Sequence, residues 1–169
     1  MKKNCGKQYN LAQEVQQRGG DVLHSEIFGK AMREPQHWSS VGAHSLGVAA
    51  DALKIANFLT CFGLCADRDV LVHCALCHDL GIIDRLQKYG NSAARCCRDH
   101  PSDSLQTYEQ YIRPASPTAK DCILHHMFPM QPVPPHTLEG IIINLADKWS
   151  SIKEAFGRGQ RQGILDMEL

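Results

Sequence analysis

The sequence predicts an all-α fold, built as a single compact helical bundle. Apolar residues recur at spacings of three and four along several long segments, whereas alternation with a period of two is weak throughout. The length of 169 residues suits one domain with a real core, because chains divide into several domains only at greater length. Hydrophobic residues make up 43% and charged residues 21%, which is ordinary for a globular protein and argues against disorder.

Composition also excludes some classes of partner. The 18 basic residues balance 18 acidic ones, and a protein that grips long nucleic acid usually carries a basic excess. We therefore expect no long nucleic-acid partner. The basic N-terminus is not followed by an apolar stretch, and no segment approaches the roughly 18 apolar residues of a membrane helix. We expect a cytoplasmic protein that has no membrane contact and is a monomer or a homodimer.

The eight cysteines are expected to be reduced thiols, since no export signal is visible. Cys61 and Cys65, with Cys74 and Cys77, have a spacing that could be read as a zinc site. However, Cys74 and Cys77 belong to an apolar run that is typical of a buried helix. We interpret these thiols as small buried side chains.

The first half of the chain contains two clear helical segments. Residues 1–40 are expected to form a helical extension or lid over a core of residues 41–156. Residues 41–59 carry an apolar helical face that includes His44, and residues 67–79 predict a second helix that Gly81 ends. The polar stretch 86–99 predicts a solvated loop. A third helix is expected from about residue 101 to residue 112, before Pro114.

Two further helices are expected in the second half. Ser116 is a predicted N-cap with Pro117 at the first helical position, and this helix continues to His126. Four prolines between residues 129 and 135 then forbid regular helix. Thr137 caps a last long helix that ends before Gly157. Its predicted wide apolar face comprises Leu138, Ile141, Ile142, Leu145, Ala146, Trp149, Ile152 and Phe156.

Polar groups interrupt the apolar faces of these helices. They are His44, the His78–Asp79 pair, His126 and Asp147, and His100 opens another predicted helix. A lone buried histidine is more often a satisfied core residue than a ligand. Burying each group singly would cost several kcal/mol, however, unless the groups are paired or coordinated. Facing one another across a bundle, they would form a metal coordination shell.

This order of residues resembles the HD superfamily of metal-dependent phosphohydrolases. The matching segments are Ala-His-Ser-Leu-Gly-Val-Ala around His44, Cys-His-Asp-Leu-Gly around His78, and Leu-Ala-Asp-Lys around Asp147. His100 and His126 match the subset of the family that binds two metals. The segment Leu-His-His-Met-Phe-Pro is similar to small stand-alone bacterial members, whose pattern aligns His126 as the ligand.

The resemblance implies a binuclear metal centre. One ion would be held by His44, His78, Asp79 and Asp147, and Asp79 would bridge to a second ion completed by His100, His126 and, as in some members, His125. Such ligands suit two divalent transition-metal ions, with Fe or Mn expected first and Zn, Co or Ni as alternatives. Two ions roughly 3.5–4 Å apart can share a hydroxide and clamp phosphate oxygens for in-line attack.

Other residues receive roles from their place near this pattern. Besides the bridging Asp79, catalytic roles are assigned to Asp84 and Lys148. The stretch before His100 is expected to cross the mouth of the site, where cationic groups can hold substrate phosphates. These substrate-binding candidates are Arg85, Lys88 and Arg98. His37 is expected to cover the site, whereas His24, His73 and His136 are interpreted as structural.

Absent motifs narrow the expected activity. Leu80-Gly81-Ile82-Ile83 replaces the Glu-Asp pair of alarmone hydrolases, Ile82 replaces a histidine of the family's diiron oxygenases, and no Gly-Tyr-Pro motif is present. We expect a phosphomonoesterase or phosphodiesterase that acts on a nucleotide or another small phosphate ester. The alternatives are a single-metal nucleoside monophosphate phosphatase and a catalytically weak, metal-stabilised regulatory or binding module.

Overall fold

A computed structural model describes residues 10–36 and 38–157. The expectation that His37 covers the site concerns a residue outside these ranges. Within the described part, the protein is built from eight α-helices, one 3-10 turn and one short hairpin, which confirms the all-α prediction. The elements are α1 (Leu11–Leu23), α2 (Glu26–Ala31), β1 (Pro35–Gln36), β2 (Ser39–Ser40), α3 (Val41–Thr60), α4 (Arg68–Cys77), η1 (Leu80–Ile82), α5 (Arg85–Tyr89), α6 (Ala93–Tyr111), α7 (Pro117–His125) and α8 (Leu138–Ala155).

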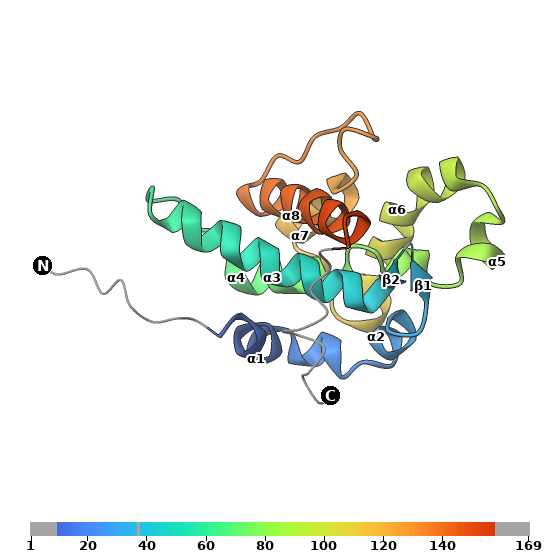
Figure 1. Ribbon diagram of the computed structural model, residues 1–169, viewed down its shortest axis with the longest axis horizontal. Helices are drawn as coiled ribbons and strands as arrows, with labels where there is room; N and C mark the ends of the chain where they lie inside the picture. Colours follow the sequence, from blue (N-terminus) through green and yellow to red (C-terminus); the bar gives the residue numbers. More distant parts are fainter. Residues whose placement is uncertain (1–9, 37, 158–169) are drawn as a thin grey trace, which may run out of the picture.

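The long helix α3 forms the middle of the bundle. It packs against α4, α8 and α1, while α7 packs against α8 and η1 packs against α6. Figure 1 shows α1 and α2 on one side of α3, α7 and α8 on the other, and α5 and α6 at one end. α3 is buried around most of its circumference, since residues such as Val41, Val48 and Leu53 have no exposed surface. A helix that is apolar nearly all round is stable only in such a central position.

Side-chain caps define where the helices begin. Ser116 accepts the backbone N–H of Ala119, and Thr137 accepts that of Gly140, so both predicted N-caps are confirmed. Each hydroxyl satisfies one of the N–H groups that have no partner within the helix. None of the described helices is long and apolar enough to cross a bilayer.

α6 begins eight residues earlier than predicted, at Ala93, and contains Pro101 in its interior. The predictions of a loop over residues 86–99 and of a helix opening at His100 were therefore wrong. An internal proline removes one donor, which leaves the carbonyl four residues earlier without its helical partner. Here the side chain of Gln131 donates to the carbonyls of Cys97 and Arg98, at 3.0 Å each. A residue from the proline-rich loop thus compensates for the missing bond.

The predicted wide apolar face of α8 is only partly buried. Ile142 and Ala146 are fully buried, and Leu138 packs against the core. α8 contacts α3 and α7 along a narrower stripe than its apolar residues occupy, because periodicity does not specify how much of a face a neighbour will cover. Five residues of the predicted face are instead 44% to 77% exposed: Ile141, Leu145, Trp149, Ile152 and Phe156.

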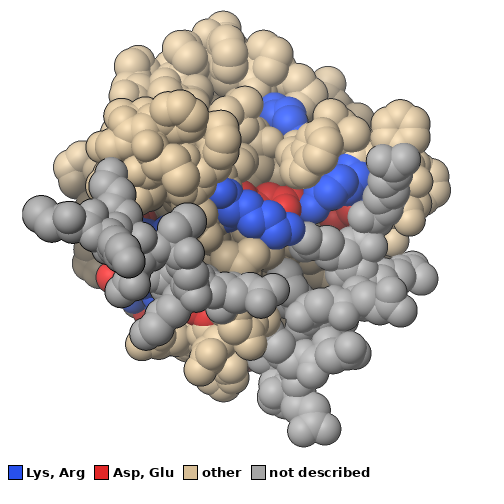
Figure 2. All heavy atoms as spheres, turned by 60° about the vertical axis from the view of Figure 1, so that its left-hand side comes forward, with Lys and Arg blue, Asp and Glu red and all other residues tan. Residues whose placement is uncertain are grey.

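The cysteines and the charges also have defined places. Cys74, Cys77 and Cys122 are buried in the core, whereas Cys61 and Cys65 are exposed, so the interpretation of all these thiols as buried filler holds only in part. On the face drawn in Figure 2, lysine and arginine atoms lie beside aspartate and glutamate atoms around a hollow. Charges of both signs are therefore mixed on that face, as the zero net charge suggests.

Candidate metal centre

Four imidazoles and two carboxylates converge in the interior of the bundle. They come from five α-helices and the turn between them, and each residue is at most 8% exposed. The structure thus brings together six of the seven residues proposed as ligands from the sequence. These are His44 in α3, His78 at the end of α4, Asp79 before η1, His100 in α6, His126 at the end of α7 and Asp147 in α8.

One half of the cluster lies around Asp147 and one oxygen of Asp79. His44 Nε2 is 3.1 Å from Asp147 Oδ1 and 4.0 Å from Asp79 Oδ2. His78 Nε2 is 3.4 Å from Asp79 Oδ2 and 3.8 Å from Asp147 Oδ1. The ligand atoms of His44, His78 and Asp147 all lie within 4.8 Å of one another, which is close enough to share one ion.

The other half lies around the second oxygen of Asp79. His100 Nε2 is 3.2 Å and His126 Nε2 is 3.4 Å from Asp79 Oδ1. The two imidazole nitrogens are 2.9 Å apart. Because Oδ2 of Asp79 faces one pair of imidazoles and Oδ1 faces the other pair, this carboxylate stands between two groups of ligands.

Gly81 allows Asp79 to take this position. A Cβ at Gly81 would lie 2.3 Å from the carbonyl oxygen of His100 and 2.6 Å from the backbone nitrogen of Ser104. Only glycine permits such a close approach of two backbones. The Gly81 N–H also donates to Ser104 Oγ at 2.8 Å. The turn that follows the His78–Asp79 pair is therefore fixed directly against the helix that carries His100.

Backbone carbonyls orient three of the four rings. In each, Nδ1 lies 2.7 to 2.8 Å from a carbonyl oxygen in its own helix. A carbonyl only accepts hydrogen bonds, so Nδ1 carries the proton and Nε2 of the neutral ring carries a lone pair that points inward. The carbonyls are those of Ala75 for His78, Cys96 for His100 and Ile123 for His126.

Glu154 orients the fourth ring. Its Oε1 lies 3.0 Å from His44 Nδ1, so His44 is held by a carboxylate from α8 and not by its own helix. A carboxylate behind a ligating imidazole fixes the ring and increases its basicity. Glu154 was not predicted, although its position seven residues after Asp147 places both on one helix face.

Gln36 is a second residue that the sequence did not indicate. Its Nε2 donates to Asp79 Oδ2 at 2.7 Å from the hairpin that precedes α3. Its Oε1 is buried, and no residue that the structure describes donates a hydrogen bond to it. A single glutamine in a two-residue strand carries no local signal of such a role, because the contact joins segments far apart in the chain.

The donor set fits a transition-metal ion. His78 Nε2 is buried, and no group among the described residues forms a hydrogen bond with it, which costs free energy unless a cation occupies its lone pair. The inward lone pairs of His100 and His126 also face each other at 2.9 Å, where they repel unless positive charge lies between them or beside them. Mixed imidazole and carboxylate ligands suit Fe, Mn, Zn or Co better than Mg.

The pKa shifts of four of the six residues show the same preference for positive charge. Burial lowers the pKa of His44, but hydrogen bonds to Asp147 and Glu154 outweigh it and raise that pKa to about 10. Burial likewise lowers the pKa of His100, but Asp79 and the Cys96 carbonyl raise it to about 10. For Asp79 and Asp147 burial raises the pKa, yet the surrounding imidazoles hold it well below its usual range. Metal ions and protons therefore compete for this cluster.

Lys148 borders the cluster, whereas two other cationic candidates do not contact it. Lys148 Nζ lies 3.2 Å from Asp147 Oδ2 and also donates to the carbonyl of His126. Arg98 instead pairs with Asp99 at 2.7 Å on the surface. Arg85 Nε is buried, and within residues 10–36 and 38–157 it has no hydrogen-bond acceptor.

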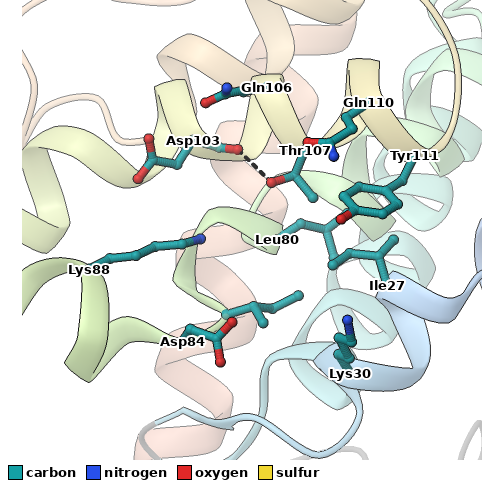
Figure 3. A pocket seen from close by; sticks show the side chains of 11 residues that line it. Ile27, Lys30, Leu80, Asp84, Lys88, Asp103, Gln106, Thr107, Gln110 and Tyr111 are labelled. Atoms are coloured by element: carbon teal, nitrogen blue, oxygen red, sulfur yellow. Dashed lines mark hydrogen bonds between the residues drawn. The ribbon is translucent and has the colours of Figure 1, made fainter.

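Asp84 and Lys88 line a separate pocket of about 430 Å³, to which Leu80 of η1 also contributes. Figure 3 shows both side chains there, together with Lys30, Asp103 and Tyr111. Lys88 Nζ donates to the Gly81 carbonyl at 3.1 Å. None of the six converging residues lines this pocket. The structure therefore does not bring Asp84 and Lys88 to the cluster.

His125 is also directed elsewhere. Its Nδ1 lies 2.9 Å from Asp121 Oδ1, and its ring lies against that of His136, with centroids 5.6 Å apart. Adjacent residues at the end of a helix point in different directions, so His126 can enter the cluster only while His125 faces away. His125 is thus the seventh predicted ligand, and it lies apart from the other six.

The chain matches the model of a known protein family. Residues 41–152 match the HD domain family, and all six converging residues lie within this range. No curated protein and no solved structure matches the chain. The matched range covers more than half of the 169 residues, so the chain belongs to the HD-domain family.

Proposed function

We propose that this HD-domain protein is a metal-dependent phosphohydrolase that cleaves a small phosphate ester, such as a nucleotide. The family is composed mostly of metal-dependent hydrolases, which supports the reaction class. The observation that carries the proposal is the grouping of four inward-facing imidazole nitrogens around the two oxygens of Asp79. Two divalent ions are expected, with Fe or Mn first and Zn, Co or Ni as alternatives.

The two halves of the cluster would each hold one ion. His44, His78 and Asp147, with Asp79 Oδ2, form the ligands of the first site. The second site consists of His100, His126 and Asp79 Oδ1. When bound, such ions supply Lewis acidity that lowers the pKa of a water nucleophile and stabilises negative charge on the phosphate.

The residues of the chain then contribute orientation and charge. Glu154 fixes the ring of His44 from behind, and Gln36 fixes the Asp79 carboxylate. Lys148, at the edge of the cluster, is proposed to contact a phosphate oxygen. Arg85, Lys88 and Arg98 are left out of the proposal, because none of them has a described contact with the cluster.

Metal reconstitution tests this function. The chelator-treated chain is reloaded with Mn²⁺ or Fe²⁺, its bound metal is counted, and its hydrolysis of p-nitrophenyl phosphate, bis-p-nitrophenyl phosphate and nucleoside monophosphates is measured. We expect two ions per chain and metal-dependent release of product. A fully loaded chain that cleaves none of these esters would instead support the metal-stabilised binding module.

One observation favours the single-metal alternative. His100 and His126 are close enough for one proton to bridge their Nε2 atoms at 2.9 Å without a metal. In that case only the half around His44, His78 and Asp147 would hold an ion. One metal equivalent per chain, together with full activity of His100→Ala, would identify a single-metal phosphatase.

A further inference from the structure

A second group of potential ligands lies outside the metal centre. Asp121 and His125 are one turn apart on α7, and His136 belongs to the loop that leads into α8. One atom from each residue can be chosen so that all three lie within 4.8 Å of one another. We call these three residues the peripheral cluster. The sequence gives His136 no role beyond a structural one.

The two carboxylate oxygens of Asp121 differ in their hydrogen-bond partners. Its Oδ2 accepts from the backbone N–H of Thr137 at 2.9 Å and from the Thr137 hydroxyl at 2.6 Å. Its Oδ1 faces the Nδ1 atoms of His125, at 2.9 Å, and of His136, at 3.2 Å. The backbone N–H of His136 lies between the two oxygens, 3.1 Å from Oδ1 and 3.0 Å from Oδ2. A carboxylate oxygen has two lone pairs, and the two imidazole nitrogens compete for those of Oδ1 with the shared N–H of His136. An imidazole in its other tautomer can offer a lone pair to a cation instead.

We propose that the peripheral cluster binds a zinc ion through Asp121 Oδ1, His125 Nδ1 and His136 Nδ1. Zinc takes imidazole nitrogen and carboxylate oxygen at about 2.0–2.2 Å in tetrahedral geometry, which places ligand atoms roughly 3.3 Å from each other. The two distances from Asp121 Oδ1 to the imidazole nitrogens, 2.9 and 3.2 Å, need only small adjustments to reach that value. Three protein ligands leave the fourth position to water.

The surroundings of the peripheral cluster prepare it for a cation. Burial raises the pKa of Asp121, but hydrogen bonds from Thr137 and its neighbours outweigh it and hold that pKa well below its ordinary value. The carboxylate is therefore ionised whenever imidazole is neutral. Pro134 and Pro135 immediately precede His136 and restrict the backbone that carries it. Little conformational entropy is then lost when His136 binds an ion.

The position of the ion gives it a structural role. Asp121 and His125 lie on the helix that ends at His126, and His136 precedes the helix that carries Asp147. Zinc at the peripheral cluster would tie these two segments together from outside the bundle. The proposal does not depend on phosphoester hydrolysis, since none of its three residues belongs to the metal centre.

Zinc binding is compared between His136→Gln and a matched control, His24→Gln. His24 is also exposed, and its Nδ1 lies 2.6 Å from the carbonyl of Gly20 in the preceding helix. Tight zinc equivalents are counted by competition with a chromogenic chelator. We expect wild type and His24→Gln to bind one more equivalent than His136→Gln and His125→Gln, which lose at least about tenfold in affinity at this site. Equal zinc binding by His136→Gln and His24→Gln would overturn the proposal.

A residue-specific measurement separates this site from the metal centre. Diethyl pyrocarbonate should acylate His136, whose side chain is 67% exposed, and mass spectrometry of peptides locates the modification. We expect zinc, and not Mg²⁺, to protect His136 in wild type and equally in Asp79→Ala. If Asp79→Ala does not fold, His44→Ala takes its place. Modification of His136 that zinc leaves unchanged counts against the peripheral site, whereas loss of hydrolysis alone concerns only the proposed function.

Discussion

The metal centre and the peripheral cluster are made of the same two residue types, yet they differ in how the side chains are prepared. In the centre, every ring has a partner at Nδ1 that directs Nε2 inward, and all six groups are buried. In the peripheral cluster, Nδ1 itself faces the carboxylate, and His136 is largely exposed. Ligand chemistry alone therefore does not make a catalytic centre. Under the proposed function, fixed tautomers and exclusion of water distinguish the central residues as ligands suited to catalysis.

The largest expected effect comes from Asp79→Ala, which removes the carboxylate between the two halves of the centre. We expect loss of both central ions and a fall in hydrolysis of about 1,000-fold, the upper end of the 10²–10³ that removal of one electrostatic group from an active site commonly costs. The measurements are metal content and kcat. Asp79→Asn, which keeps the volume, controls for packing, and full metal occupancy in Asp79→Ala would refute the role of this residue as a bridge.

His100→Ala should weaken one half of the metal centre and leave the other half intact. It removes one of the two imidazoles at Asp79 Oδ1 and leaves His44, His78 and Asp147 in place. We expect one ion to remain and kcat to fall by about 100-fold, as for loss of one stabilising group. Metal analysis beside turnover measures this, with His24→Gln as a histidine control. Two retained ions would show that the second site does not need His100 as a ligand.

Glu154→Gln tests whether the partner behind His44 matters. The amide keeps the shape but loses the negative charge that faces Nδ1. We expect metal affinity of the first site to fall about 10- to 100-fold, as for other groups that orient a ligating histidine. Competition with a fluorescent chelator gives the affinity, and Glu109→Gln, a surface glutamate on α6, serves as the control. An unchanged affinity would mean that burial alone orients His44.

The ion pairs of Glu14 form a third charged region, for which no metal is proposed. Glu14 on α1 accepts hydrogen bonds from Arg68 at 2.6 and 2.8 Å and from Arg18 at 2.9 Å. The Arg68 hydrogen bond is the largest contribution that holds the pKa of Glu14 below 4.5, against the opposing effect of burial. Because the folded pKa is depressed, this contact stabilises the fold above the unfolded pKa, and its contribution is lost as pH falls through the folded pKa.

Glu14→Gln should therefore lower the free energy of unfolding of the metal-free chain by about 1–2 kcal/mol near neutral pH, as expected for hydrogen bonds to charged groups. The difference from wild type should shrink well below pH 4.5. Urea unfolding at several pH values, with chelator present throughout, measures both effects. A difference that does not change with pH would show that packing, and not charge, accounts for the loss.

Local sequence signals predicted where helices begin better than they predicted which distant segments contact those helices. Ser116 with Pro117, and Thr137, mark helix starts by interactions within four residues, so the sequence was sufficient there. Pro101 led to the wrong predicted start of α6, because proline is normally excluded from the interior of an α-helix. Its effect is offset by Gln131, thirty positions later, and no local pattern contains that contact. For the same reason the sequence could not show that part of the apolar face of α8 is exposed.

The candidate site divides in a similar way. His44, the His78–Asp79 pair and Asp147 stand out because polar groups interrupt apolar helical faces. The choice of His126 over His125 follows from helix geometry together with the family pattern. Residues that act from behind the ligands, such as Glu154, have ordinary surface-like contexts in the sequence. Only the folded backbone shows which of them reach an imidazole.

The contact between Gln131 and the carbonyls beside Pro101 has a consequence for how the sequence can change over evolutionary time. Surface loops usually accept insertions and deletions. The loop after His126 cannot do so freely, since its length places the Gln131 amide on the carbonyls of Cys97 and Arg98, only two to three residues before His100. Adding or removing a residue between 126 and 131 would break this register. We expect the spacing there to be inherited almost unchanged, while side chains around it vary.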